Sequence, residues 1–235
     1  MRTRTITMLS VLAALAVPVV ASARFLRFGP PTLCFPVDVG SAETLPTERS
    51  ALARDVSLES AALAVLGRST DAMVHMETLR RAQLMVASGA EADRLIDQLK
   101  DRVLLAEVAD ASAHDRALAW FDLGYCLRTC EHAGRKMALD PQPELEKAVR
   151  CAPDDAALQF GAAVGSFDSR GGMPLYYGHV AAAARLAPDA SSPVGKNLAA
   201  IVKWFTPELL AGDYHELARR ADAARAASEQ RRREF

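Results

Sequence analysis

The sequence has few aromatic residues, few cysteines and almost no net charge. Phe, Trp and Tyr make up 6% of the 235 residues, and 28 Lys and Arg balance 29 Asp and Glu, for a formal net charge of −1. This balance gives no general electrostatic reason to bind nucleic acid. A hydrophobic fraction of 50% excludes a disordered chain, and four cysteines are too few for a disulfide-dense miniprotein.

Long hydrophobic runs are absent except at the N-terminus. Arg2 and Arg4 precede an apolar run from Ile6 to Val20, and Ala21-Ser22-Ala23 supplies the small residues that signal peptidase accepts. The run is shorter than the roughly 20 apolar residues of a membrane-spanning helix, although an uncleaved anchor is the alternative. We therefore expect residues 1–23 to be a signal peptide, and the mature protein to be periplasmic or secreted without stable membrane insertion.

Prolines and glycines are scarce in most of the chain but gather in residues 24–46. Four prolines and two glycines there exclude a long helix, so we expect an extended arm that docks its phenylalanines on the body. From residue 47 to residue 235, apolar residues recur at spacings of three and four, and no convincing period-two alternation indicates a strand. The prediction is an all-α domain, with early helices over 47–66, 72–86, 92–106 and 113–132.

The second half of the chain contains a repeat. Residues 146–154 align with residues 181–189 at an offset of 35, and both segments end in Ala-Pro-Asp. The pairs Leu123-Gly124, Phe160-Gly161 and Val194-Gly195 recur at steps of 37 and 34. A period near 34 that contains two helices and a turn indicates a helical solenoid.

Residues 115–230 resemble the tetratricopeptide repeat. Trp120, Leu123 and Gly124 match the W-x2-L-G start of its first helix, Ala-Pro-Asp resembles its inter-repeat turn, and Gly212-Asp213-Tyr214 resembles the turn inside one unit. Pro207 departs from the pattern because it interrupts a first helix. The resemblance implies antiparallel helical hairpins in a right-handed solenoid; an irregular helical bundle is the alternative. Gly-Pro-Pro, Leu-Cys and Pro-Val-Asp-Val-Gly near the start of the mature chain resemble exported bacterial proteins, which implies no activity.

Stacked helical hairpins form a concave groove that suits extended peptides or partner segments. The main functional hypothesis is therefore an exported binding or scaffold protein with a protein or peptide partner, without a cofactor or a catalytic residue. Seven polar or aromatic side chains fall on candidate first helices and are predicted to line the groove: Trp120, Asp122, Tyr125, Gln159, Lys196, Asn197 and Lys203.

The alternative hypothesis is an exported hydrolase-like enzyme that uses the loop at residues 168–179. This loop gathers polar residues and two glycines, and its candidate site residues are Asp168, Ser169, Arg170, Tyr176 and His179. A nucleophile elbow needs G-x-S-x-G, and a phosphate loop needs G-K-[ST]; neither is present. Binding is preferred, because each recognisable pattern is structural.

The four cysteines gain a possible role from the expected export, since disulfides persist outside the cytoplasm. If residues 113–132 and 143–152 form a hairpin centred near residue 138, Cys126 faces Cys151, and these two are the disulfide candidates. Buried reduced thiols are the alternative. Cys126-x3-Cys130 lies on a predicted helix rather than in a turn, and a zinc site would need a further ligand, so no metal is expected.

Overall fold

The computed structural model describes residues 29–167, 169, 172–210 and 213–234, and these residues contain helices and no strands. The predicted signal peptide and residues 24–28 of the arm lie outside them. The α-helices are α2 (Pro31–Cys34), α3 (Leu58–Leu66), α4 (Ala72–Met85), α5 (Gly89–Val108), α6 (Ala113–His132), α7 (Pro141–Cys151), α8 (Ala156–Ser166), α9 (Met173–Leu186), α10 (Pro193–Phe205) and α11 (Leu217–Arg233), with 3₁₀ turns at Arg49–Ala51, Pro207–Leu210 and Tyr214–Glu216.

Local capping side chains set most helix starts. Ser112 accepts a hydrogen bond from a backbone N–H in the first turn of α6, and this helix has the predicted bounds. The helix expected from residue 47 is wrong at its start. Ser57 caps α3 by accepting from the Ser60 N–H, whereas residues 49–51 form only a 3₁₀ turn without a side-chain cap.

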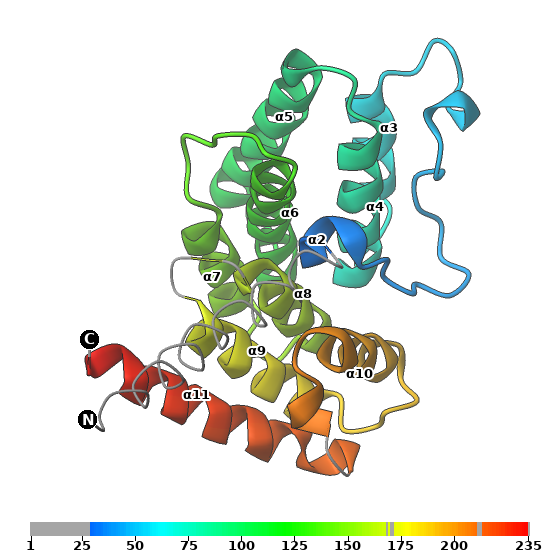
Figure 1. The fold of residues 1–235 in the computed structure, drawn as a ribbon. Coiled ribbons are helices and arrows are strands. Elements are labelled where there is room, and N and C mark those ends of the chain that lie inside the picture. The colour runs from blue at the N-terminus through cyan, green and yellow to red at the C-terminus, as the bar shows by residue number, and fades with distance from the viewer. Residues whose placement is uncertain (1–28, 168, 170–171, 211–212, 235) are drawn as a thin grey trace, which may run out of the picture.

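Helix α6 lies at the centre of the bundle, with α4, α5, α7 and α8 packed around it (Figure 1). Its buried residues point in every direction around the helix axis, from Ala117 to Cys130. Further along the chain, α8 packs on α9, and α11 lies along α9 at the other end of the molecule. The all-helical class is confirmed, and the right-handed solenoid remains a prediction.

The repeated glycines lie where helices approach closely. A Cβ atom on Gly124 would lie 2.9 Å from the backbone nitrogen of Leu145, so α7 would have to move away from α6. A Cβ atom on Gly161 would overlap the ring of Phe121, which joins α8 to α6. These two positions of the repeat therefore mark helix–helix contacts rather than turns.

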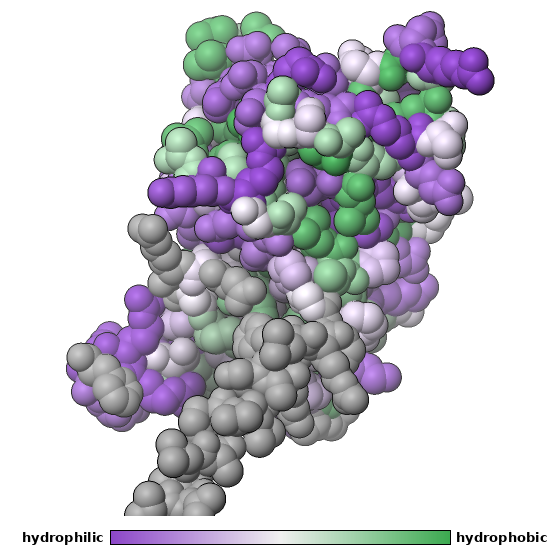
Figure 2. All heavy atoms as spheres, turned by 45° about the horizontal axis from the view of Figure 1, so that its top comes forward, coloured by the Kyte–Doolittle hydropathy of each residue, from purple (hydrophilic) through white to green (hydrophobic). Residues whose placement is uncertain are grey.

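The arm crosses the outside of the helices between α2 and α3 (Figure 1). It is a short helix followed by extended chain, and residues 46–57 beyond it are mostly exposed. The face of the molecule seen in Figure 2 is largely hydrophilic, with hydrophobic side chains in small groups. No helix in the described part of the chain is long and apolar enough to cross a membrane.

Candidate functional site

Charged side chains on α4 bind the backbone of the arm. Glu77, which is 1% exposed, accepts a hydrogen bond from the Val37 N–H at 3.1 Å. Arg80 donates to the carbonyl oxygen of Leu33 at 3.2 Å, and Arg81 donates to that of Leu45 at 2.5 Å. One turn of α4 therefore holds the arm at three points through main-chain atoms.

The same three side chains form an ion cluster in which Glu77 is buried and the two arginines are half-buried. The Glu77 carboxylate lies 2.7 Å from the Arg80 guanidinium and 2.6 Å from that of Arg81. Burial alone would raise the pKa of Glu77, but hydrogen bonds from both arginines hold this pKa below its usual value. The carboxylate therefore stays ionised and remains an acceptor for the arm.

Asn197 on α10 binds both main-chain groups of one arm residue. Its Oδ1 accepts from the N–H of Asp38 at 2.8 Å, and its Nδ2 donates to the carbonyl oxygen of Asp38, also at 2.8 Å. Nδ2 also donates to the carbonyl oxygen of Pro193 at 2.9 Å, which fixes the orientation of the amide. An amide that donates at one end and accepts at the other matches the N–H and C=O of any residue, whatever side chain that residue carries.

Apolar side chains of the arm are buried against the body. Phe35, Val37 and Leu45 are 5%, 4% and 2% exposed. The Phe35 ring meets the Trp204 ring edge to face, with centroids 6.1 Å apart. We call the surface that contacts residues 33–45 the arm-binding face, and its members are Glu77, Arg80, Arg81, Asn197 and Trp204.

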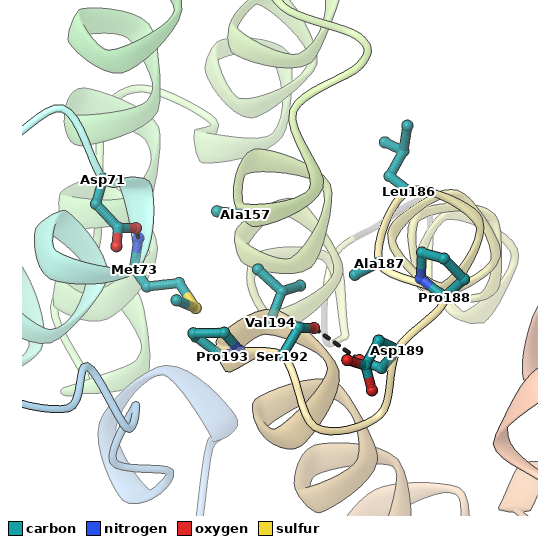
Figure 3. A pocket seen from close by; sticks show the side chains of 10 residues that line it. All are labelled: Asp71, Met73, Ala157, Leu186, Ala187, Pro188, Asp189, Ser192, Pro193 and Val194. Carbon is teal, nitrogen blue, oxygen red and sulfur yellow. Dashed lines mark hydrogen bonds between the residues drawn. The ribbon is translucent and has the colours of Figure 1, made fainter.

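An open pocket of about 390 Å³ adjoins the arm-binding face (Figure 3). Asn197 links the two, because its Nδ2 lies 3.7 Å from the sulfur of Met73, which lines the pocket. The lining is mainly apolar and comes from α4, α8, the end of α9 and the start of α10. Two carboxylates also line it, and each has a local role: Asp71 caps α4, and Asp189 accepts from the N–H of Ser191.

Of the seven predicted groove residues, Asn197 is the one that hydrogen-bonds to the described part of the arm, residues 29–46. Asp122, Tyr125 and Gln159 are buried in the body, so the prediction that they line an open groove is wrong. The reason is that α6 and α8 lie inside the bundle, where helices cover faces that the repeat pattern left exposed. Lys196 and Lys203 are exposed on α10.

Trp120 contacts two neighbouring helices. Its Nε1 donates to Glu107 at 2.7 Å, and the ammonium of Lys147 lies 3.9 Å from the ring centroid. These contacts join α6 to α5 and α7, so the side chain stabilises helix packing.

Asp122 belongs to a buried charge network. Its carboxylate lies 2.7 Å from Nδ1 of His75 and 3.0 Å from the guanidinium of Arg102. Nε2 of His75 faces the carbonyl oxygen of Ser69 at 3.0 Å. Every polar atom of the imidazole is therefore engaged, and the network connects α4, α5 and α6 as a structural unit.

The loop predicted at 168–179 is wrong from Met173 onward, where α9 begins, and its described residues make separate contacts. Tyr176 bonds to the hydroxyl of Thr206 at 3.0 Å, and the ring of His179 lies between Gln159 and Glu146, at 2.9 and 3.1 Å. Ser169 accepts from the N–H of Gly172, which is a local turn. Asp168 and Arg170 lie outside the described residues. Ser169 and His179 are thus engaged with different partners, and no observation favours the hydrolase alternative.

All four cysteines are free thiols, so the 126–151 disulfide is not formed in this structure. Cys126 instead contacts Cys130, one turn along α6, and the Cys130 thiol lies 3.1 Å from Oε1 of Gln83 on α4. Cys34 is exposed on the arm. Among the described residues, no cluster of three or more His, Cys, Asp or Glu side chains could hold a metal ion.

Sequence reasoning did not single out Glu77, Arg80 or Arg81, although they hold the arm. The available signal was three charged residues on the side of the 72–86 helix away from its apolar stripe, which a solvated helix surface would show equally. A comparison of the chain with known protein families, with curated proteins and with solved structures finds no match.

Proposed function

We propose that this protein is an exported helical binding protein, and that its arm-binding face, with the adjoining pocket, takes up an extended polypeptide segment of a protein partner. The observation that supports this most is how the body holds residues 33–45. Asn197, Glu77, Arg80 and Arg81 all bind main-chain atoms, which any extended polypeptide carries. Peptides that bind by strand addition also gain affinity from main-chain hydrogen bonds and specificity from pockets for alternate side chains.

The exposed lysines of α10 allow a direct test. A photo-crosslinking amino acid replaces Lys196 in the full mature chain, which is then irradiated in an envelope extract. The matched control carries the same group at Lys136, an exposed residue of the α6–α7 loop. We expect mass spectrometry to find a defined segment of one partner joined at position 196 and not at position 136. Equal capture at both positions, or none at 196, would contradict the proposal.

The export component has its own test. The mature protein should be recovered from the periplasm or the medium with Arg24 as its first residue, as the signal-peptide pattern predicts. Recovery of chains that keep Met1 in the membrane fraction would show an uncleaved anchor instead.

A further inference from the structure

The arm meets the body through a repeating pattern of side chains. Phe35 and Val37 are buried, Val39 is half-buried, and the intervening Pro36 and Asp38 are exposed. This alternation is what an extended chain produces when one edge faces a surface. The body therefore selects apolar residues at every second position and leaves the others free.

Two hydrogen bonds between arm and body use arm side chains, Thr32 with His132 and Glu43 with Arg68, whereas the others carry no sequence information. These others end on the oxygens of Leu33 and Leu45, on the nitrogen of Val37 and on both main-chain groups of Asp38. A second segment with the same apolar alternation would make the same bonds. The arm therefore presents what the arm-binding face would recognise in any segment: main-chain donors and acceptors, and apolar residues at alternate positions.

Residues 35–45 also have features that allow their release from the body. They form no helix or strand, so their release breaks no regular ladder of hydrogen bonds. Gly40 has φ of +61°, a conformation that suits a turn, and no other atom lies within 4 Å of the place where its Cβ would be. The exposed stretch at 46–57 gives the chain room to move on the C-terminal side of this segment, while α2 anchors its N-terminal side.

We propose that residues 35–45 are an exchangeable internal ligand, and that the partner segment displaces them by presenting an aromatic residue and two aliphatic ones at alternate positions, as in Phe35-Pro36-Val37-Asp38-Val39. This rests on the proposed function. An internal ligand competes at high effective concentration, so the apparent affinity for a partner falls with the fraction of molecules whose face is open. Weakening the arm should therefore strengthen binding of a competing segment.

The test uses a fluorescently labelled synthetic peptide of residues 33–46 and the full mature chain. In the chain, Phe35→Ser and Val37→Ser weaken the arm without changing the arm-binding face. We expect fluorescence anisotropy to show at least tenfold tighter binding of the peptide to this variant than to the unchanged chain. Val56→Ser, at an exposed apolar position beyond the arm, is the matched control and should bind like the unchanged chain. A peptide with Ser at both positions should not bind.

A covalent lock tests the same exchange in the opposite direction and does not depend on a destabilised variant. Glu43 and Arg68 form an exposed ion pair between the arm and the end of α3, at 2.8 Å. With Glu43→Cys, Arg68→Cys and Cys34→Ser, a short thiol crosslinker should abolish peptide binding, whereas the uncrosslinked protein keeps it. Equal binding by weakened, unchanged and locked chains would overturn the exchange. Partner capture at position 196 that persists in the locked chain would also overturn it, while leaving the binding of a partner intact and assigning it to the adjoining pocket.

Discussion

Replacing Asp122 with Asn should destabilise the protein far more than a comparable change at its surface. The carboxylate is fully buried and pairs with His75 and Arg102, which come from the two helices that flank α6. Asn keeps the size and one acceptor oxygen but removes the negative charge. Both cationic partners then lose the group that compensates for their burial, and the imidazole is 0% exposed.

The expected cost follows from the burial of the pair. Removing one partner of a buried ion pair costs about 3–5 kcal/mol, and Asn belongs at the lower end because it retains a hydrogen bond. About 3 kcal/mol corresponds to a fall in melting temperature of roughly 6–12 °C for a chain of this size. The matched control is Asp97→Asn on α5. Its ion pair with Lys100 leaves 67% and 44% of the two side chains exposed, so its cost should stay below about 1 kcal/mol.

The cost should also depend on pH in one direction. Burial alone would lower the pKa of His75, but the charge and hydrogen bond of Asp122 raise this pKa above 6.5. The folded state therefore holds the proton more tightly than the unfolded state does. This stabilisation is complete below about pH 6.5 and is lost as pH rises through the folded-state pKa. The difference between the unchanged protein and Asp122→Asn should thus be largest at pH 6 and smaller at pH 9.

Urea unfolding followed by circular dichroism between pH 6 and pH 9 measures both effects. A double-mutant cycle with His75→Gln should show that the two losses are not additive, because each change removes the same pair. A cost below about 1 kcal/mol at pH 6, or one that grows as pH rises, would refute the reasoning.

Three further outcomes are expected. Gly161→Ala should cost about 2 kcal/mol in urea unfolding despite its better helix propensity, because the new methyl overlaps the Phe121 ring; Gly178→Ala, which meets only a flexible arginine, should be near neutral. Burial, together with the charge of a nearby arginine, lowers the pKa of His132 to about 4. The stability of the protein should therefore fall as pH drops from about 6.5 to 4, and His132→Gln should flatten this decline. Parallel stability profiles of the two proteins would contradict this. Under native conditions iodoacetamide should label Cys34 first, and the buried thiols of α6 only on unfolding; equal rates in peptide mapping would show that α6 is open.

Local sequence signals determined the helices. The apolar residues of 113–132 predicted a helix there, and the structure has that helix with those bounds, because a 3.6-residue period acts within one segment. Phe35 on a Pro- and Gly-rich arm was expected to dock on the body, and it does. The start of α3 was missed, since Thr47 and Ser57 are both residues that cap helices and only Ser57 is used.

Tertiary structure alone decided which side chains meet the arm. Tyr125 and Asn197 both fall on candidate first helices, yet α6 is enclosed on all sides and α10 is not, so the first is buried in the core and the second binds the arm. The role of Glu77 depends on Val37, 40 residues away, and no periodicity within either segment carries that information. A helix pattern specifies which residues share a face, whereas the packing of the other helices specifies what that face touches.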